Sequence, residues 1–135
     1  MSETSRVLHP AFRSKIMSAE QAAALIQPCD KVGMSGFTGA GHPKAVPVEL
    51  AKRISAAHAR GEAFRIDVLT GASTAPELDT ALAEVDGMEM RLPYQSDPVC
   101  RKKINEGSMH YSDIHLSHVA QHARFGFYGK MTVAV

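Results

Sequence analysis

Alternation of apolar and polar residues predicts where the strands of this chain lie. Phe64, Ile66 and Val68 are separated by Arg65 and Asp67, and this period of two is typical of a half-buried strand. Shorter apolar segments on either side have the same character. The predicted strands span 31–36, 64–70, 88–92 and 130–135.

A helical period appears between these strands. Leu50, Ile54 and Ala57 fall on one face of a helix, Pro47 suits its first turn, and Gly61 is a suitable residue just past its end. Similar spacing recurs along the chain. The predicted helices span 19–27, 47–60, 75–86, 98–106 and 114–124.

Capping signals mark the start of three of these helices. A side-chain oxygen at the N-cap accepts a hydrogen bond from a backbone amide that the helix leaves unpaired. The signals are two capping-box pairs, Ser18 with Gln21 and Thr74 with Glu77, and an Asp97–Pro98 pair in which the aspartate caps and the proline starts the helix.

The order of the elements predicts the fold class. Strands separated by helices pair in parallel through right-handed crossovers, which predicts a three-layer α/β domain with a mainly parallel sheet. We divide the chain into an N-terminal arm over residues 1–16 and one domain over residues 17–135. Because the last predicted strand is apolar up to Val135, we expect the domain to be truncated there and incomplete at its C-terminus.

Composition narrows the classes of partner. The chain has 135 residues, 44% of them hydrophobic, so we expect one domain with a hydrophobic core. Its net charge is only +1, so the charge gives no indication that nucleic acid is a partner. We see neither a signal peptide nor an apolar run long enough for a membrane helix, and we therefore expect a cytoplasmic protein without a membrane partner. Cys29 and Cys100 are interpreted as two buried free thiols.

The strongest local motif is the glycine-rich stretch from Ser35 to Lys44, which follows the first predicted strand. Ligands of parallel α/β domains bind at the carboxyl ends of strands, and glycines let backbone amides approach an anion. The motif is neither a Walker A loop nor a dinucleotide fingerprint. On spacing alone, a ligand-binding loop and a plain tight connection are about equally supported.

A second motif, Thr70 to Thr74, follows the second predicted strand. Thr74 is the predicted N-cap of the next helix, so Ser73 is the residue whose hydroxyl remains available for a ligand. A substrate carboxylate could accept a hydrogen bond from it. If the two loops converge, Ser73 and the backbone of residues 36–41 should face one cleft at the carboxyl edge of the sheet.

These motifs carry a family resemblance. The stretch from Ser35 to Lys44 and the segment Gly71–Thr74 resemble the N-terminal signatures of the acetyl-CoA hydrolase and succinyl-CoA:acetate CoA-transferase family. Asp113–His118 and Gly126–Lys130 resemble that family too, and the likeness runs from about residue 12 to residue 135.

The resemblance implies a fold, a reaction and a set of site residues. It implies a class I CoA-transferase type of fold in a longer, two-domain protein that is usually dimeric, so a homo-oligomer is expected for the full-length protein. It also implies that coenzyme A is a substrate rather than a cofactor and that small carboxylic acids are its other partners. A glutamate and a glycine loop of the second domain, neither present here, would catalyse the reaction through a glutamyl-CoA thioester. The residues implied to bound the small-acid pocket are Gly36, Phe37, Thr38, Gly39, Gly41 and Ser73.

Two alternatives remain beside this interpretation. His115, His118 and His122 fall on one face of a predicted helix, with His110 nearby, and imidazoles so placed could bind zinc or nickel. We favour a polar helix face, because no carboxylate or cysteine at ligand spacing completes the set. The other alternative is a small anion- or nucleotide-binding module that uses the glycine-rich loop alone.

Overall fold

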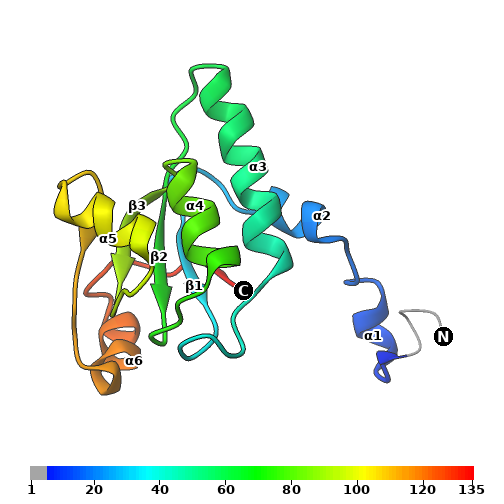
Figure 1. The fold of residues 1–135 in the computed structure, drawn as a ribbon. Helices are drawn as coiled ribbons and strands as arrows, with labels where there is room; N and C mark the ends of the chain where they lie inside the picture. Colours follow the sequence, from blue (N-terminus) through cyan, green and yellow to red (C-terminus); the bar gives the residue numbers. More distant parts are fainter. Residues whose placement is uncertain (1–5) are drawn as a thin grey trace.

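The computed structural model describes residues 6–135 and has a five-stranded parallel sheet at its centre (Figure 1). The strand order is β4-β3-β2-β1-β5, and every neighbouring pair is parallel, which confirms the predicted fold class. The strands are β1 (Lys31–Met34), β2 (Ile66–Thr70), β3 (Met88–Leu92), β4 (His110–Tyr111) and β5 (Val133–Ala134).

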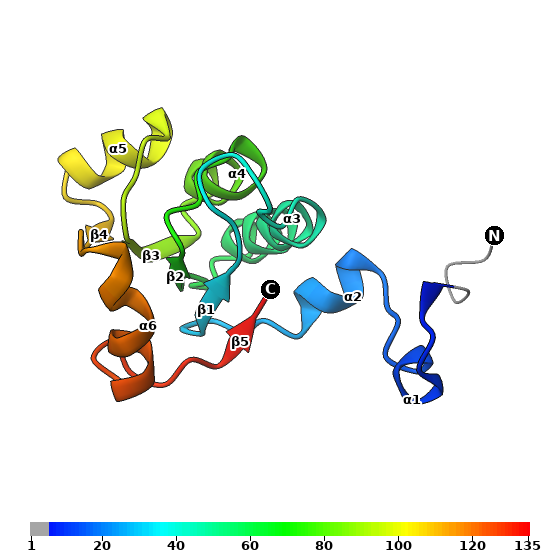
Figure 2. The same ribbon diagram turned by 90° about the horizontal axis from the view of Figure 1, so that it is seen from below.

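Helices cover both faces of the sheet, so the domain has three layers. Figure 2 shows α3, α4 and α5 on one face and α6 on the other, while α2 packs against α3 beside the sheet. The helical elements are α1 (Pro10–Arg13), α2 (Ala19–Ala24), α3 (Ala45–Ala59), the π-helical turn η2 (Pro76–Thr80), α4 (Ala81–Glu84), α5 (Pro98–Asn105) and α6 (Leu116–Phe125).

The core lies between the sheet and α3, η2 and α4. Leu50 and Ile54 of α3 are fully buried against Val32 and Val68 of the two central strands, as the helical and strand periods predict. Gly87 lies against this core, since a Cβ added there would lie 2.8 Å from Ile54 Cδ1. By contrast, every residue of α6 is at least partly exposed, so the second face of the sheet is thinly covered.

The register of the central strands places two loops together. β1 and β2 pair in register from Lys31 with Asp67 to Met34 with Thr70, so both strands end at the same edge of the sheet. The glycine-rich loop after β1 and the 71–75 loop after β2 therefore leave from adjacent points.

Several element boundaries differ from prediction. Within the arm predicted over 1–16, residues 10–13 form the one-turn helix α1, and residues 1–5 lie outside the described part. The strands predicted over 31–36, 64–70 and 130–135 are shorter than expected, and β4 was not predicted, because two residues show no alternation. Across residues 6–135, no helix combines the length and the apolar character needed to cross a membrane.

One predicted cap is formed and another is not. The Ser18–Gln21 capping box is present, with Gln21 N donating to Ser18 Oγ at 3.1 Å. The predicted Thr74–Glu77 box is wrong. Ala75 is the N-cap of η2, and its amide donates to Asp79 Oδ2 at 2.9 Å. The Thr74 hydroxyl does not cap this turn and is hydrogen-bonded to Ser96.

The buried position of Ile54 predicts the stability effect of its truncation. Ile54→Ala should lower the free energy of unfolding by about 2–5 kcal/mol, because it removes three buried carbon atoms and leaves a cavity beside Gly87. Urea unfolding followed by circular dichroism measures this value. The neighbouring exposed change Ser55→Ala is the matched control and should stay within about 0.5 kcal/mol. Equal effects of the two substitutions would contradict the placement of this core.

Candidate functional site

The two loops after β1 and β2 join into one structure. Thr38 and Ser73 form an isolated parallel bridge, in which Thr38 N donates to Ala72 O at 2.9 Å and Thr74 N donates to Thr38 O at 3.0 Å. The predicted site residues of the two loops are therefore brought together at the carboxyl edge of the sheet.

The glycine-rich loop also closes on itself. Phe37 and Ala40 exchange two backbone hydrogen bonds of 2.9 and 3.1 Å, and Ser35 Oγ donates to Gly41 O at 3.0 Å. The amides of Phe37, Thr38 and Ala40 are thus bonded to carbonyls of the loops and are not free for an anion. This arrangement counts against a module that cradles an anion with these amides.

Gly36 lies in a tight contact between the two loops. Its φ is +113°, and a Cβ added there would lie 2.8 Å from His42 N and 2.9 Å from Ser73 Oγ. Only glycine fits this contact. The tip of the loop is open instead, because nothing lies within 4 Å of a Cβ built on Gly39 and the Phe37 side chain is exposed.

Ser73 lies where the sequence places it, but its hydroxyl is covered. The residue is 0% exposed, and Ser73 Oγ has no hydrogen-bond partner among the described residues. Ser73 and the glycine-rich loop thus lie at the same edge of the sheet, as expected, but the loop packs directly over the hydroxyl. A buried hydroxyl without a partner is costly, by about 1–3 kcal/mol, and such groups call for an explanation.

His42 is a second buried polar side chain of this region. Only 6% of its side chain is exposed, and neither ring nitrogen has a hydrogen-bond partner among residues 6–135. His42 Nε2 lies 3.3 Å from Glu77 Oε2, an ion-pair distance without hydrogen-bond alignment. The hydrogen bond from its own backbone amide, helped by nearby His42 and Lys44, lowers the pKa of the Glu77 carboxyl.

A buried ion pair beneath the loops was not found by sequence reasoning. Arg91 of β3 and Asp79 of η2 are both fully buried, and Arg91 Nε donates to Asp79 Oδ1 at 2.9 Å. The sequence offers one sign of this pair, since Arg91 and Asp79 are charged residues that each lie within an apolar segment. Neither segment shows from sequence alone that its charged residue points inward.

Arg91 holds the turn that carries Ser73. One guanidinium nitrogen donates to Ser73 O, and the other donates to Thr70 Oγ1 at 3.0 Å and to Leu92 O at 2.7 Å. Thr70 Oγ1 in turn accepts a hydrogen bond of 3.2 Å from Ser73 N. Both backbone polar groups of Ser73 are thereby fixed, so its position depends on Arg91.

Asp79 and Asp97 extend this network to α5. Gln95 Nε2 donates to Asp79 Oδ1 at 2.9 Å, and Asp97 N donates to Gln95 Oε1 at 2.7 Å. Asp97 Oδ1 accepts hydrogen bonds from Val99 N and Cys100 N, both 3.0 Å long, which confirms the predicted Asp97 cap.

Three histidines of the metal hypothesis, His115, His118 and His122, lie in or next to α6, whereas His110 lies in β4. The ring centroids of His115 and His118 are 5.8 Å apart, those of His118 and His122 are 6.1 Å apart, and His122 Nδ1 lies 3.2 Å from the Tyr128 hydroxyl. Over residues 6–135, no group of three or more histidine, cysteine, aspartate or glutamate side chains is arranged to hold a metal ion.

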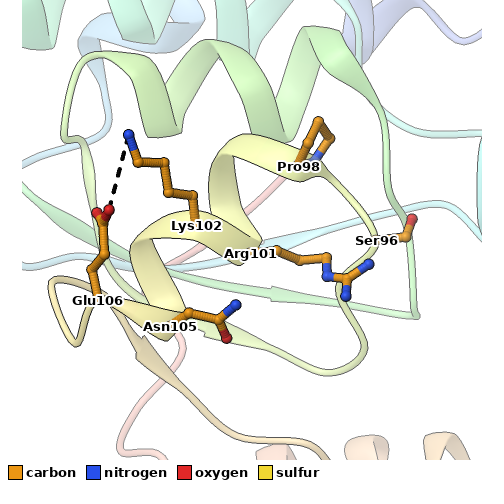
Figure 3. A pocket seen from close by; sticks show the side chains of 6 residues that line it. All are labelled: Ser96, Pro98, Arg101, Lys102, Asn105 and Glu106. Carbon is orange, nitrogen blue, oxygen red and sulfur yellow. Dashed lines mark ion pairs between the residues drawn. The ribbon is translucent and has the colours of Figure 1, made fainter.

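Two hollows of the described domain lie against the helices α5 and α6. One, of about 480 Å³, runs along α5 at the surface, where Arg101 and Asn105 project and Lys102 pairs with Glu106 at 3.9 Å (Figure 3). The other, of about 460 Å³, lies between α6 and the second face of the sheet. Its apolar lining includes Leu69, Val119 and Met131.

The fold and the joined loops define a class of protein, a parallel α/β domain whose candidate site lies at a strand edge between two glycine-containing loops. The acetyl-CoA hydrolase/transferase N-terminal domain family matches residues 2–135, and the chain belongs to this family.

Relatives of known activity support the assignment. The chain is 44% identical over 119 residues to the propanoyl-CoA:succinate CoA transferase of Escherichia coli, covering 88% of this chain and 24% of that protein. It is 38% identical to the succinyl-CoA:acetate CoA-transferase of Clostridium kluyveri, covering 96% and 24%, and 34% identical to the acetyl-CoA hydrolase of Kluyveromyces lactis, covering 93% and 24%. The chain therefore spans about a quarter of the length of these relatives.

A solved structure shares the fold. RipA from Yersinia pestis matches with a TM-score of 0.63 at 16% identity, over 90% of this chain and 28% of that chain. At this identity the likeness supports the fold alone.

The buried pair predicts a large asymmetry between single and double substitutions. Asp79→Asn should lower the free energy of unfolding by about 3–5 kcal/mol, because it leaves the Arg91 charge buried without a counter-charge. Replacing both residues, Asp79→Leu with Arg91→Met, should recover part of the loss. Urea unfolding measures both effects. Glu106→Gln, which removes an exposed pair with Lys102, should cost at most about 1 kcal/mol. A comparably small effect of Asp79→Asn would contradict the network.

The two thiols differ in reactivity. Both were expected to be buried, but Cys29 is exposed and only Cys100 is buried. Burial, reinforced by the carboxylates of Asp79 and Asp97, raises the pKa of the Cys100 thiol far above its usual range. Because the thiolate is the reactive form, Ellman's reagent should label Cys29 alone in the native protein and both thiols in urea. Cys29→Ser should abolish native labelling, and rapid native labelling of two thiols would contradict this arrangement.

Proposed function

We propose that this chain forms one wall of the small-carboxylate pocket of an acyl-CoA hydrolase or CoA-transferase. The observation that carries the proposal is the junction of the two loops at Gly36, which holds the unpartnered Ser73 hydroxyl at the carboxyl edge of the sheet. The names of the relatives support the chemistry, because they act on acetyl-CoA, propanoyl-CoA or succinyl-CoA. The pocket residues are those implied by the family resemblance: Gly36, Phe37, Thr38, Gly39, Gly41 and Ser73.

The proposed reaction passes through the enzyme as a thioester. A glutamate carboxylate attacks the acyl-CoA carbonyl, the C–S bond breaks, and an acyl-glutamyl anhydride and CoA thiolate result. The thiolate then attacks the glutamyl carbonyl and releases the acid as its carboxylate, which leaves glutamyl-CoA. An acceptor carboxylate reverses these steps to form a new acyl-CoA, whereas water hydrolyses the glutamyl-CoA thioester to regenerate the glutamate and release CoA.

The glutamate and the oxyanion donors are proposed to lie outside this chain. Five glutamates of the described domain do not match the family nucleophile. Glu62 pairs with Arg60, Glu77 with His42, Glu89 with Arg65 and Glu106 with Lys102, and Glu84 is exposed.

The remaining partners follow from the same proposal. Coenzyme A enters as a substrate and no further cofactor is required. The complete protein is a cytoplasmic homo-oligomer, without a nucleic-acid or membrane partner.

The proposal predicts binding without turnover. The isolated 135-residue chain should release no thiol from acetyl-CoA, with or without acetate or succinate, because covalent catalysis needs a positioned nucleophile. Acetate should nevertheless shift the amide resonances of Gly36 and Thr74 at millimolar concentration, and Ser73→Ala should weaken this binding. Ser55→Ala, remote from the loops, is the matched control.

Two outcomes would contradict the proposed roles. Turnover by the chain that disappears in Glu77→Gln would show that Glu77 is the nucleophile. Acetate shifts that are unchanged in Ser73→Ala would remove Ser73 from the pocket.

A further inference from the structure

Two polar side chains near Gly36 are buried and have no hydrogen-bond partner within residues 6–135. They are Ser73, which is 0% exposed, and His42, whose side chain is 6% exposed. Buried polar groups are nearly always paired, so two orphaned groups on adjoining loops indicate a missing partner common to both. The two residues are neighbours at Gly36, because the backbone nitrogen of His42 and Ser73 Oγ lie 2.8 and 2.9 Å from the position of a Cβ on Gly36.

The chemistry of the two groups defines what that partner can be. A hydroxyl and an imidazole N–H both donate hydrogen bonds, and a carboxylate accepts bonds through both of its oxygens. The backbone amides of Phe37, Thr38 and Ala40 are already bonded to carbonyls, so these three amides are not free to bind a ligand at this place.

A carboxylate of the protein already lies against this site. Glu77 Oε2 is 3.3 Å from His42 Nε2, yet the contact does not satisfy the imidazole as a hydrogen bond. The Glu77 side chain is 45% exposed, so it can leave without disturbing the core. The hydrogen bond from its own backbone amide, together with His42 and Lys44, lowers the pKa of the Glu77 carboxyl and so favours its anionic form.

We infer that His42 is a further carboxylate-binding residue of the pocket, acting together with Ser73, and that Glu77 occupies its entrance as an internal competitor for substrate carboxylate. This inference rests on the proposed function and adds His42 and Glu77 to it. Glu77 then makes the site selective, because only a ligand that displaces it reaches the imidazole.

The competitor role predicts the direction in which removal of the Glu77 carboxylate changes ligand affinity. Removing an ordinary structural contact weakens ligand binding, whereas removing an internal competitor strengthens it. Glu77→Gln should tighten acetate binding by roughly fivefold or more, the effect expected when a like charge a few ångströms from the ligand is removed from a partly exposed site. Glu77→Ala should act in the same direction, which guards against an effect specific to glutamine.

The experiment is an acetate titration of the 135-residue chain followed through the Gly36 and Thr74 amide resonances. Sodium chloride keeps the ionic strength constant, and acetamide serves as the neutral analogue, which should cause no comparable shift. Glu84→Gln removes an exposed charge from the same helical segment and should leave the dissociation constant unchanged. His42→Phe keeps a ring but removes both nitrogens, and it should abolish the gain produced by Glu77→Gln in the double variant.

The outcomes separate this inference from the proposed function. Tighter binding in Glu77→Gln that depends on His42 supports both. Acetate binding that depends on Ser73 but is unchanged or weaker in Glu77→Gln and Glu77→Ala overturns the competitor and leaves the proposed function in place. If acetate shifts no loop resonance in the wild type or in Glu77→Gln, the inference and the carboxylate pocket are both wrong.

Discussion

The Arg91–Asp79 ion pair is the constraint on which the geometry of the site depends. Both side chains are fully buried, and a guanidinium is stable away from water only when its donors are satisfied. Here they reach Asp79, Thr70 and the Ser73 carbonyl, so β3, η2 and the Ser73 turn cannot shift independently. The ion pair therefore contributes geometric precision to this edge of the sheet in addition to any stability.

The unusual turn of η2 belongs to the same arrangement. Asp79 and its neighbour Leu78 are both fully buried, although consecutive residues of a regular helix point about 100° apart. The wider π-helical turn from Pro76 to Thr80 accommodates this pair of inward positions. It also leaves the Ala75 amide to be capped by Asp79, which explains why the Thr74–Glu77 signal in the sequence is not used.

The sequence predicts a structural feature well when residues close together in the chain determine it, and poorly when contacts between distant segments do. Periodicity alone predicts the helix that contains Leu50 and Ile54 and the strand that contains Ile66 and Val68. In each element one face is buried, so the spacing of its apolar residues reveals the type of element. Arg91 could not be placed in this way. The register with β2 shifts between Ile66 and Asp67, so Arg91 pairs with Val68 and points to the core, whereas strict alternation from Met88 would turn it outward. The convergence of the loops was predicted from topology, but the burial of Ser73 depends on contacts made by a distant loop.

The closure of the glycine-rich loop bears on the kind of ligand that suits the proposed pocket. A glycine-rich loop that binds phosphate presents free backbone amides, and the rigid positions of those amides supply the specificity. In this loop the amides of Phe37, Thr38 and Ala40 hold the loop to itself and to the next one. In the proposed pocket, these three amides support the loop, and the side chains beneath it would bind the ligand. Arg91 and Thr70 fix the backbone carbonyl and amide of Ser73, which restricts where its hydroxyl can lie. In the proposed pocket, one hydroxyl so placed suits an acceptor oxygen of a small acid better than a polyphosphate.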